Sequence, residues 1–457
     1  MTTYHVRFWD IRKISDTARG RYRVRWAAGG REHCKSFATK ALADAFLGTL
    51  KDAARDGTPF DPATGQPARP ALARAAVSWY DHARAYSQMK WPGLAAKSRR
   101  SVAEALTTIT LALTAPRRKA PGPDLLRRAL FGYAFNAASA TRPVPAEIIR
   151  VLDWIAKASL PVAALEDPDT IRAVLSACAR RLDGRPAAAA TGRRKRAVLA
   201  NALGYAVERR LLSASPLSQI QWKAAEVAET VDRRSVASPA QAARLLAVVR
   251  QQGPRGEHME AFFGCLYYAA LRPSEAVALH EPDLVLPDSG WGRIDLAASC
   301  PRAGTEWTDD GASREERGLK HRPAGETRSI PIPPVLVELL RNHLKRYGTG
   351  PDGRVFRTAR GGPLNDTGYG EVWQRARPLA LTPAQQASPL ARRPYDLRHA
   401  AVSLWLNGGV PATEVARRAG HGVAVLLRVY ANCIDGQAGP ANQRISDALD
   451  EDNNEPG

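Results

Sequence analysis

The sequence predicts a mainly α-helical protein with small β-sheets, divided into three domains. Near the N-terminus, apolar and basic residues alternate in short runs, as they do along strands. From about residue 71 to 228 the apolar positions recur at helical spacing, and the C-terminal half mixes amphipathic helices with short apolar strands. A chain of 457 residues is long enough for two or three cores. We expect domains at 1–66, 67–231 and 232–457.

The N-terminal domain is expected to be a three-stranded sheet with one helix, followed by a linker. The candidate strands cover residues 4–9, 21–26 and 31–37. Thr39 is a candidate cap for an amphipathic helix over 40–54, and the Gly-, Pro- and Asp-rich residues 55–70 are typical of a linker.

Arginines recur along these strands and would share a face of the sheet. They are Arg7, Arg21, Arg23 and Arg25. Such a face could lie in a DNA groove. The alternative is an oligomerisation or capping module whose arginines are merely solvated.

The middle domain is expected to be helical, with breaks at Pro116–Pro123 and Pro143–Pro145. Its most basic run comes just before a strong helix expected over 197–211, and consists of Arg193, Arg194, Lys195 and Arg196. Cations at a helix start oppose the helix dipole, so an anion such as a DNA phosphate would compensate them. The alternative is a solvated charged face.

Composition points to a polyanionic partner. Lys and Arg number 66 against 45 Asp and Glu, which gives a net charge of +21 and a pI near 10.2. The alternative is a basic surface that only reflects a composition rich in Arg and Ala. The five cysteines have no paired spacing and no apolar run reaches membrane-spanning length, so we expect a cytoplasmic, nucleoid-associated protein without metal site or membrane contact.

The C-terminal domain begins near Ser238, whose Ser-Pro-Ala-Gln sequence is typical of a capped helix start. An apolar segment ends at Arg272-Pro273, which predicts a corner between two helices. A guanidinium at that corner could grip two phosphate oxygens, with Glu275 orienting it. A structural ion pair is the alternative.

Lys320 is expected on a hairpin between a strand at 294–296 and one running through Ile330. A lysine there could protonate a leaving oxygen as a general acid, although Arg322 and Lys345 are rivals for that assignment. The segment 300–318 is expected to be flexible.

Four further residues follow in ordered local contexts. Tyr395 and Arg398 lie three apart at a helix start and so share a face. His421 follows Gly420, a candidate left-handed helix cap, and Tyr430 lies on the last turn of a helix over 423–431. Two guanidiniums, an ammonium, an imidazole and a phenol suit attack on a phosphodiester, with the cations activating the phenol. A tyrosine at a helix end is more commonly a packing residue.

These contexts together resemble the tyrosine recombinases, or phage-type integrases. The residues that carry the resemblance are ALRPSE, LKHRPAGETRSIPIP, YDLRHA, and AGHG followed by RVYA. The spacing from His421 to Tyr430 matches the family pattern. The middle region resembles the family's core-binding domain, and the N-terminal sheet resembles an arm-binding domain.

The resemblance implies a C-shaped clamp on double-stranded DNA attachment sites of a mobile element or phage. Tyr430 would form a 3′-phosphotyrosine and free a 5′-hydroxyl. Arg272 and Arg398 would stabilise the pentacoordinate phosphorus, His421 would hydrogen-bond the phosphate, and Lys320 would be the general acid. No metal or other cofactor is implied. The family pattern also implies a homotetramer on DNA, through a C-terminal segment, and accessory bending or excision factors.

One position departs from the family. Its His-x-x-Arg is Tyr395-Asp-Leu-Arg398 here, and tyrosine does not titrate near neutrality. His399 lies about 100° further around the helix and is not expected to substitute. Two other functions share part of the pattern: type IB topoisomerase-like strand relaxation, and a catalytically silent DNA-binding regulator.

Overall fold

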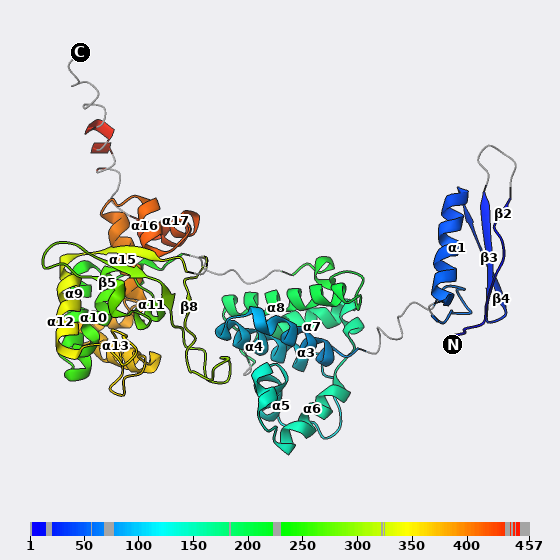
Figure 1. Cartoon of the computed structure of the whole chain (residues 1–457), viewed down its shortest axis with the longest axis horizontal. Helices are drawn as coiled ribbons and strands as arrows, with labels where there is room; N and C mark the ends of the chain where they lie inside the picture. Colours follow the sequence, from blue (N-terminus) through cyan, green and yellow to red (C-terminus); the bar gives the residue numbers. More distant parts are fainter. Residues whose placement is uncertain are drawn as a thin grey trace, which may run out of the picture. The chain divides into compact units, whose positions relative to one another are not determined.

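The computed structural model describes residues 2–14, 21–55, 57–67, 77–181, 184–222, 230–320, 323, 325–434, 439, 442–443 and 445–447 (Figure 1). It has two compact units, residues 1–94 with 98–225 and residues 95–97 with 226–457. Helices dominate both, as expected. Among the helices of the described residues, none is both long and apolar enough to span a bilayer.

A small antiparallel sheet and one helix form the N-terminal part of the first unit. The strands are β1 (Val6–Phe8), β2 (Arg12–Lys13), β3 (Tyr22–Ala28) and β4 (Arg31–Phe37), and the helix is α1 (Lys40–Arg55). β3 lies in the middle of the sheet. β4 pairs with the whole length of one edge of β3, and β1 and β2 pair with the two ends of its other edge. The first expected strand, over residues 4–9, is shortened to β1, and β2 is a fourth strand that was not predicted; the sheet plus helix is otherwise as predicted.

Strand alternation divides the residues of β3 between two faces. Val24, Trp26 and Ala28 are buried with Ala43, Leu47 and Leu50 of α1. Arg23 and Arg25 therefore lie on the face away from α1. Thr39 Oγ1 accepts a hydrogen bond from Leu42 N, as expected of a cap.

The rest of the first unit is helical. Its helices are α3 (Trp79–Lys90), α4 (Ala96–Ala112), α5 (Pro123–Ala129), α6 (Ala146–Ala158), α7 (Pro168–Cys178) and α8 (Ala189–Glu208), with a π turn at Leu130–Ala134 and shorter turns at Trp91–Gly93, Ala137–Thr141, Val162–Glu166 and Pro216–Gln219. The breaks fall at both expected proline positions. The expected bounds of the last helix, 197–211, are wrong: α8 begins eight residues earlier, so the basic run lies inside it.

In the second unit, helices surround a three-stranded antiparallel sheet. The elements are α9 (Pro239–Arg250), α10 (Pro254–Tyr268), α11 (Pro273–Val277), β5 (Leu284–Val285), β6 (Gly292–Leu296), β7 (Ala298–Ser299), β8 (Arg317–Gly318), β9 (Arg328–Ile332), α12 (Pro334–Tyr347), α13 (Asp366–Ala380), α14 (Pro383–Ala387), α15 (Asp396–Asn407), α16 (Ala412–Ala419) and α17 (Val423–Tyr430), with short turns at Arg233–Ser235, Glu281–Asp283 and Ala431–Cys433. The sheet order is β5-β6-β9, and Ile294 pairs with Ile330, so the expected hairpin is confirmed. β7 and β8 form a separate pair.

Two apolar cores hold this unit together. The larger one is formed by the sheet and α9 to α13, and includes Phe262, Phe263 and Trp373. The smaller one gathers residues of α15, α16 and α17, among them Leu426 and Tyr430. The C-terminal helices therefore form their own packed group on the second unit.

The expectation that residues 300–318 are flexible is wrong. Trp307 is buried, and the buried Arg314 donates to the carbonyls of Cys300 (2.6 Å) and Leu364 (2.7 Å) and pairs with Asp366. The glycines and charged residues of this segment had suggested a loop that makes no tertiary contacts. One arginine satisfies backbone carbonyls from two segments and so fixes the loop.

Replacing Arg314 with Met should loosen this segment, because two buried carbonyls lose their donor. We expect cleavage by a glutamate-specific protease within residues 300–318 to become at least several-fold faster. Arg302→Met is the matched control, since the Arg302 side chain is exposed and reaches Asn365 Oδ1 at 3.5 Å. Equal cleavage rates for both variants and the wild type would show that Arg314 does not hold the segment.

Candidate active site

A buried carboxylate lies at the centre of the candidate site. Glu275 on α11 is 2% exposed, and its two oxygens receive Arg272 Nη1 at 2.6 Å and Arg328 Nη1 and Nη2 at 3.1 and 2.8 Å. Arg398 Nη1 lies 4.0 Å away. Burial raises the pKa of Glu275, but Arg328, Arg272 and Arg398 outweigh it and bring the pKa to about 2. Glu275 is therefore an anion that holds three arginines together.

Arg272 takes its position from the expected corner. It is the N-cap residue of α11, with φ −73° and ψ 147°, and Pro273 opens the helix. Its backbone N–H donates to Glu275 Oε2 at 2.9 Å, and Nη2 donates to Gly420 O at 3.2 Å. The side chain is 22% exposed, so the guanidinium borders solvent while its partners are buried.

Arg398 on α15 is completely buried. Its guanidinium donates to the carbonyls of Ala270 and Ala419 and contacts His421 Nε2 at 2.9 Å. These bonds join the end of α10 to α15 and to the corner after α16. Burial and the neighbouring Arg272 lower the pKa of Arg398.

His421 lies at a tight corner, as predicted. Gly420 has φ +65° and ψ 52° and caps α16 in the left-handed conformation. A Cβ there would also lie 2.3 Å from Arg328 Nη1, so only glycine fits. Burial, Arg398, Arg272 and Arg328 lower the pKa of His421 to about 3, so the imidazole is neutral and Nε2 can accept from Arg398.

Tyr430 is the last residue of α17 and is completely buried. Its hydroxyl lies 2.9 Å from His399 Nδ1, and its ring stacks on His421 with centroids 6.1 Å apart. Burial raises the pKa of Tyr430 well above its ordinary value, although Arg398 and Arg272 oppose the shift. The phenol is therefore protonated and closed off from solvent.

Tyr395 and His399 share the start of α15 but point to different partners. Tyr395 is close enough to Arg272 to contribute to the raised pKa of that guanidinium, and its ring meets the His399 ring edge-on at 5.0 Å. His399 was not expected to substitute for the family's His, yet it is His399, and not Tyr395, whose ring nitrogen contacts the Tyr430 hydroxyl. The turn of about 100° along the helix directs it towards α17.

Lys320 is exposed and lies just after β8. Among the described residues, no hydrogen bond or ion pair links it to the other candidates. Its hairpin does adjoin the site, since Cys300 N next to β7 donates to Ser274 O of α11 at 2.8 Å. Of its rivals, Lys345 lies on the last turn of α12, and Arg322 falls outside the described residues.

Arg328 is the site residue that sequence reasoning missed. It is 2% exposed at the start of β9 and takes both oxygens of Glu275. The signal was its register: Arg328, Ile330 and Ile332 alternate along one face of the strand, and all three are buried. A charged residue in an inward position predicts a buried partner.

The candidate DNA contacts differ in exposure. In the sheet, Arg21 and Arg23 are exposed, and Arg25 pairs with Glu32 at 2.8 Å. Trp9 lies under both Arg7 and Arg25, whose guanidinium carbons are 5.4 and 5.3 Å from its ring. This face is thus basic, with one aromatic ring.

The basic run of α8 is divided among several environments. Arg193 is exposed, Arg196 is half-buried, and Arg194 bonds to Ser101 (2.8 Å) and Glu104 (3.0 Å) of α4. Lys195 is 6% exposed, so the four cations do not all lie on one solvated face. It lines a cavity of about 400 Å³ together with Arg127, Arg180 and Arg181.

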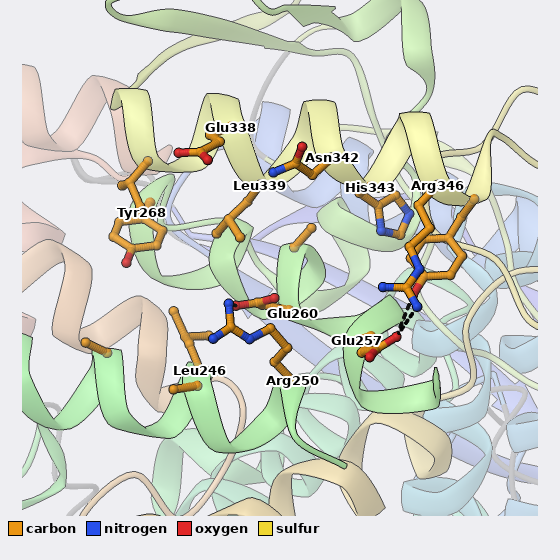
Figure 2. A pocket seen from close by; sticks show the side chains of 15 residues that line it. Leu246, Arg250, Glu257, Glu260, Tyr268, Glu338, Leu339, Asn342, His343 and Arg346 are labelled. Carbon is orange, nitrogen blue, oxygen red and sulfur yellow. Dashed lines mark hydrogen bonds and ion pairs between the residues drawn. The ribbon is translucent and has the colours of Figure 1, made fainter. Parts of the chain in front are cut away.

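The C-terminal unit has a cavity that lies apart from the candidate catalytic residues. Figure 2 shows it between α9, α10 and α12, with a volume of about 470 Å³. Glu257 pairs with Arg346 at 2.6 Å, and Glu260 lies 3.8 Å from Arg250. None of the candidate catalytic residues lines it.

No family model matches the chain. A Streptomyces ambofaciens protein named integrase is 34% identical over 124 residues, which cover 25% of this chain and 31% of that protein. The match thus spans about a third of the length of this curated relative. This relative supports the resemblance based on the motifs.

Two solved structures are similar in fold. The Tn1549 transposon integrase with circular intermediate DNA has a TM-score of 0.48 at 17% identity and covers 68% of this chain and 96% of that one. A lambda integrase dimer bound to a core site has a TM-score of 0.45 at 13% identity and covers 94% and 95%.

Glu275→Gln should destabilise the second unit by on the order of 3 kcal/mol at neutral pH, because three arginines lose their shared anion. The folded pKa of about 2 lies below the ordinary 4.5, so the carboxylate stabilises the fold above pH 4.5 and loses this effect as pH falls towards 2. Urea unfolding at several pH values should show a smaller acid-induced loss in the variant. Glu338→Gln, at an exposed position of α12, is the control. Matching curves for the two variants would rule out this role.

Proposed function

We propose that this chain is a site-specific DNA recombinase of the tyrosine recombinase family that integrates or excises a mobile element. One observation carries the proposal: Arg272, Arg398, His421 and Tyr430 come from separate elements and meet in one place. Arg398 touches His421, Arg272 reaches the carbonyl before His421, and Tyr430 stacks on His421. A packing tyrosine would not need two arginines held in place by a buried carboxylate.

The cationic groups suit a phosphodiester that gains negative charge during the reaction. Arg272 borders solvent and can donate to the nonbridging oxygens, while Arg398 and neutral His421 can complete the set of donors. Glu275 orients the arginines without contacting DNA. The donors are fixed by carbonyls and by Glu275, so little reorganisation is needed when the pentacoordinate phosphorus forms.

Tyr430 is the proposed nucleophile. Its oxygen would bond to phosphorus as the bond to the 5′-oxygen breaks, which leaves a 3′-phosphotyrosine and a 5′-hydroxyl. The phenol is completely buried in the structure, so DNA binding has to expose it. A rotation or shift at the end of α17 is the smallest motion that could do so.

Lys320 is the proposed general acid for the leaving 5′-oxygen. It is exposed beside β7 and β8, which adjoin α11, the helix that Arg272 caps. A lysine on an exposed hairpin can reach a bound phosphodiester without being part of the buried network. Tyr395 would hold Arg272 from the DNA side as a hydroxyl partner.

Two basic surfaces are the proposed contacts with attachment-site DNA. The open face of the N-terminal sheet carries Arg21, Arg23 and Arg25, and the surface of α8 carries Arg193, Arg194 and Arg196 beside the cavity that Lys195 lines. Such contacts release counterions from the DNA backbone. A homotetramer on DNA and accessory bending or excision factors remain part of this proposal.

The central test is a nicked suicide duplex made from the repeats that flank the element carrying this gene. Wild-type protein should form a covalent adduct, and Tyr430→Phe should form none, because its ring lacks the attacking oxygen. Arg272→Lys should slow adduct formation about 10²-fold or more, since an ammonium cannot bind two oxygens in parallel. Denaturing gels quantify the adduct.

Two outcomes would contradict the assignment. A wild-type chain that forms no adduct on any such duplex would leave a silent DNA-binding regulator, and an adduct with Tyr430→Phe would remove Tyr430 as nucleophile. Relaxation of supercoiled plasmid without these repeats would favour the topoisomerase-like function.

Arg23→Ala combined with Arg25→Ala should weaken binding to the same duplex about tenfold and reduce the salt dependence of binding by up to about two charges. The matched control is Lys40→Ala with Lys51→Ala, which removes the same charge from exposed positions of α1. Fluorescence anisotropy across a salt series measures both. If the two double variants behave alike, the effect is one of net charge and the sheet face does not contact DNA.

A further inference from the structure

We propose that His399 is the catalytic base that takes the proton of Tyr430 during DNA cleavage and returns it during rejoining. This inference rests on the proposed function and adds a residue to its chemistry. It concerns the helix start at which this chain departs from the family's His-x-x-Arg pattern, because a phenol, Tyr395, stands there in place of an imidazole.

The geometry places His399 on the reacting atom. Its Nδ1 lies 2.9 Å from the Tyr430 hydroxyl, within the range for general-base catalysis. Two adjacent residues of α15 contact different groups. Arg398 bonds to carbonyls and to His421, whereas His399 contacts Tyr430 on α17. One helix therefore supplies both a cation for the phosphate and a base for the nucleophile.

Other groups near the hydroxyl are unsuited to this task. His421 stacks on the Tyr430 ring, but its Nε2 is already occupied by Arg398. Tyr395 is itself a phenol, and burial raises the pKa of the Cys433 thiol. Among the described residues, His399 alone contacts the hydroxyl through a neutral lone pair.

His399 is kept neutral by its surroundings. The groups that face it are Arg398 and Arg393, the phenols of Tyr395 and Tyr430, and Asp396, which lines the same cavity. Burial, Arg398 and Arg393 lower its pKa to about 4. At neutral pH the Tyr430 O–H therefore donates to Nδ1, and the ring proton is assigned to Nε2.

A polar cavity beside His399 could take up the proton. The ring lines a cavity of about 530 Å³ that also borders Asp232, Ser235, Arg392, Arg393 and Asp396. Neither Tyr430 nor Arg398 lines it. Water in a polar cavity of this size can exchange the proton without opening the site that would hold the phosphate.

The Tyr430 oxygen forms a bond to phosphorus, its proton moves to His399 Nδ1, the bond to the 5′-oxygen breaks, and that oxygen takes a proton from Lys320. Transfer from a phenol of raised pKa to an imidazole of lowered pKa is unfavourable in the resting protein. It becomes favourable as the oxygen–phosphorus bond forms, because the phenolic oxygen then loses its basicity. The charge that phosphate brings also stabilises the imidazolium.

The test compares His399→Asn and His399→Ala on the nicked suicide duplex. Asn can accept a hydrogen bond near the Nδ1 position but cannot take a proton at neutral pH. We expect both variants to cleave about 10² to 10⁴ times more slowly than wild type. Imidazole added to His399→Ala should restore part of the rate, and the restored rate should rise with pH as imidazole becomes neutral.

A second substrate separates the base from the acid. A duplex with sulfur in place of the bridging 5′-oxygen has a leaving group that needs no proton. It should restore Lys320→Ala but leave His399→Ala slow. Leu404→Ala, an exposed position on the same helix, is the control for α15, and thermal unfolding checks that each variant is folded.

Each outcome is decisive. Cleavage by folded His399→Asn at the wild-type rate would reduce His399 to a positioning residue and overturn the proposal, as would restoration of His399→Ala by the sulfur substrate. Loss of cleavage in both variants, with imidazole rescue, supports it. A wild-type chain that forms no adduct would instead overturn the proposed function itself.

Discussion

The structure of the candidate site depends on one buried carboxylate. Glu275 pairs with Arg272 and Arg328 and lies 4.0 Å from Arg398, so three guanidiniums can share a space that water hardly enters. Without that anion, their mutual repulsion and desolvation would drive the elements apart. α11, β9 and α15 are thereby fixed relative to one another, and Gly420 brings the His421 corner against the same cluster. A site for an anionic substrate thus needs an anion of its own at its base.

The nucleophile is held in a protonated, inaccessible state by the same packing. Tyr430 belongs to the smaller core formed with α15 and α16, and α17 has just eight residues. Exposing one phenol at the end of a short helix costs far less than unfolding the unit. We infer that the cations stay preorganised while the tyrosine moves, so cleavage would depend on DNA that is properly bound. Such a division keeps a reactive group closed off between encounters with DNA.

Several features followed directly from the sequence. Proline after Arg272, glycine before His421 and the alternation along β3 each restrict the backbone locally, and each was found where expected. Two predictions failed. Residues 300–318 are fixed by the distant Arg314, which is a tertiary cause, and α8 begins eight residues early because no local break separates the basic run from the helix.

By itself, the sequence determined which groups are present, their order, and the corners and helix ends at which they lie, because these depend on neighbours along the chain. Only the tertiary structure decided which groups touch. Arg328 became a partner of Glu275, 53 positions away, and His399 became the partner of Tyr430, 31 positions away. The local sequence does not identify either partner, since each pair joins side chains from elements that are distant along the chain. The sequence thus determines the order of the candidate catalytic residues, whereas the fold determines how their charges are balanced and which group can take the proton of Tyr430.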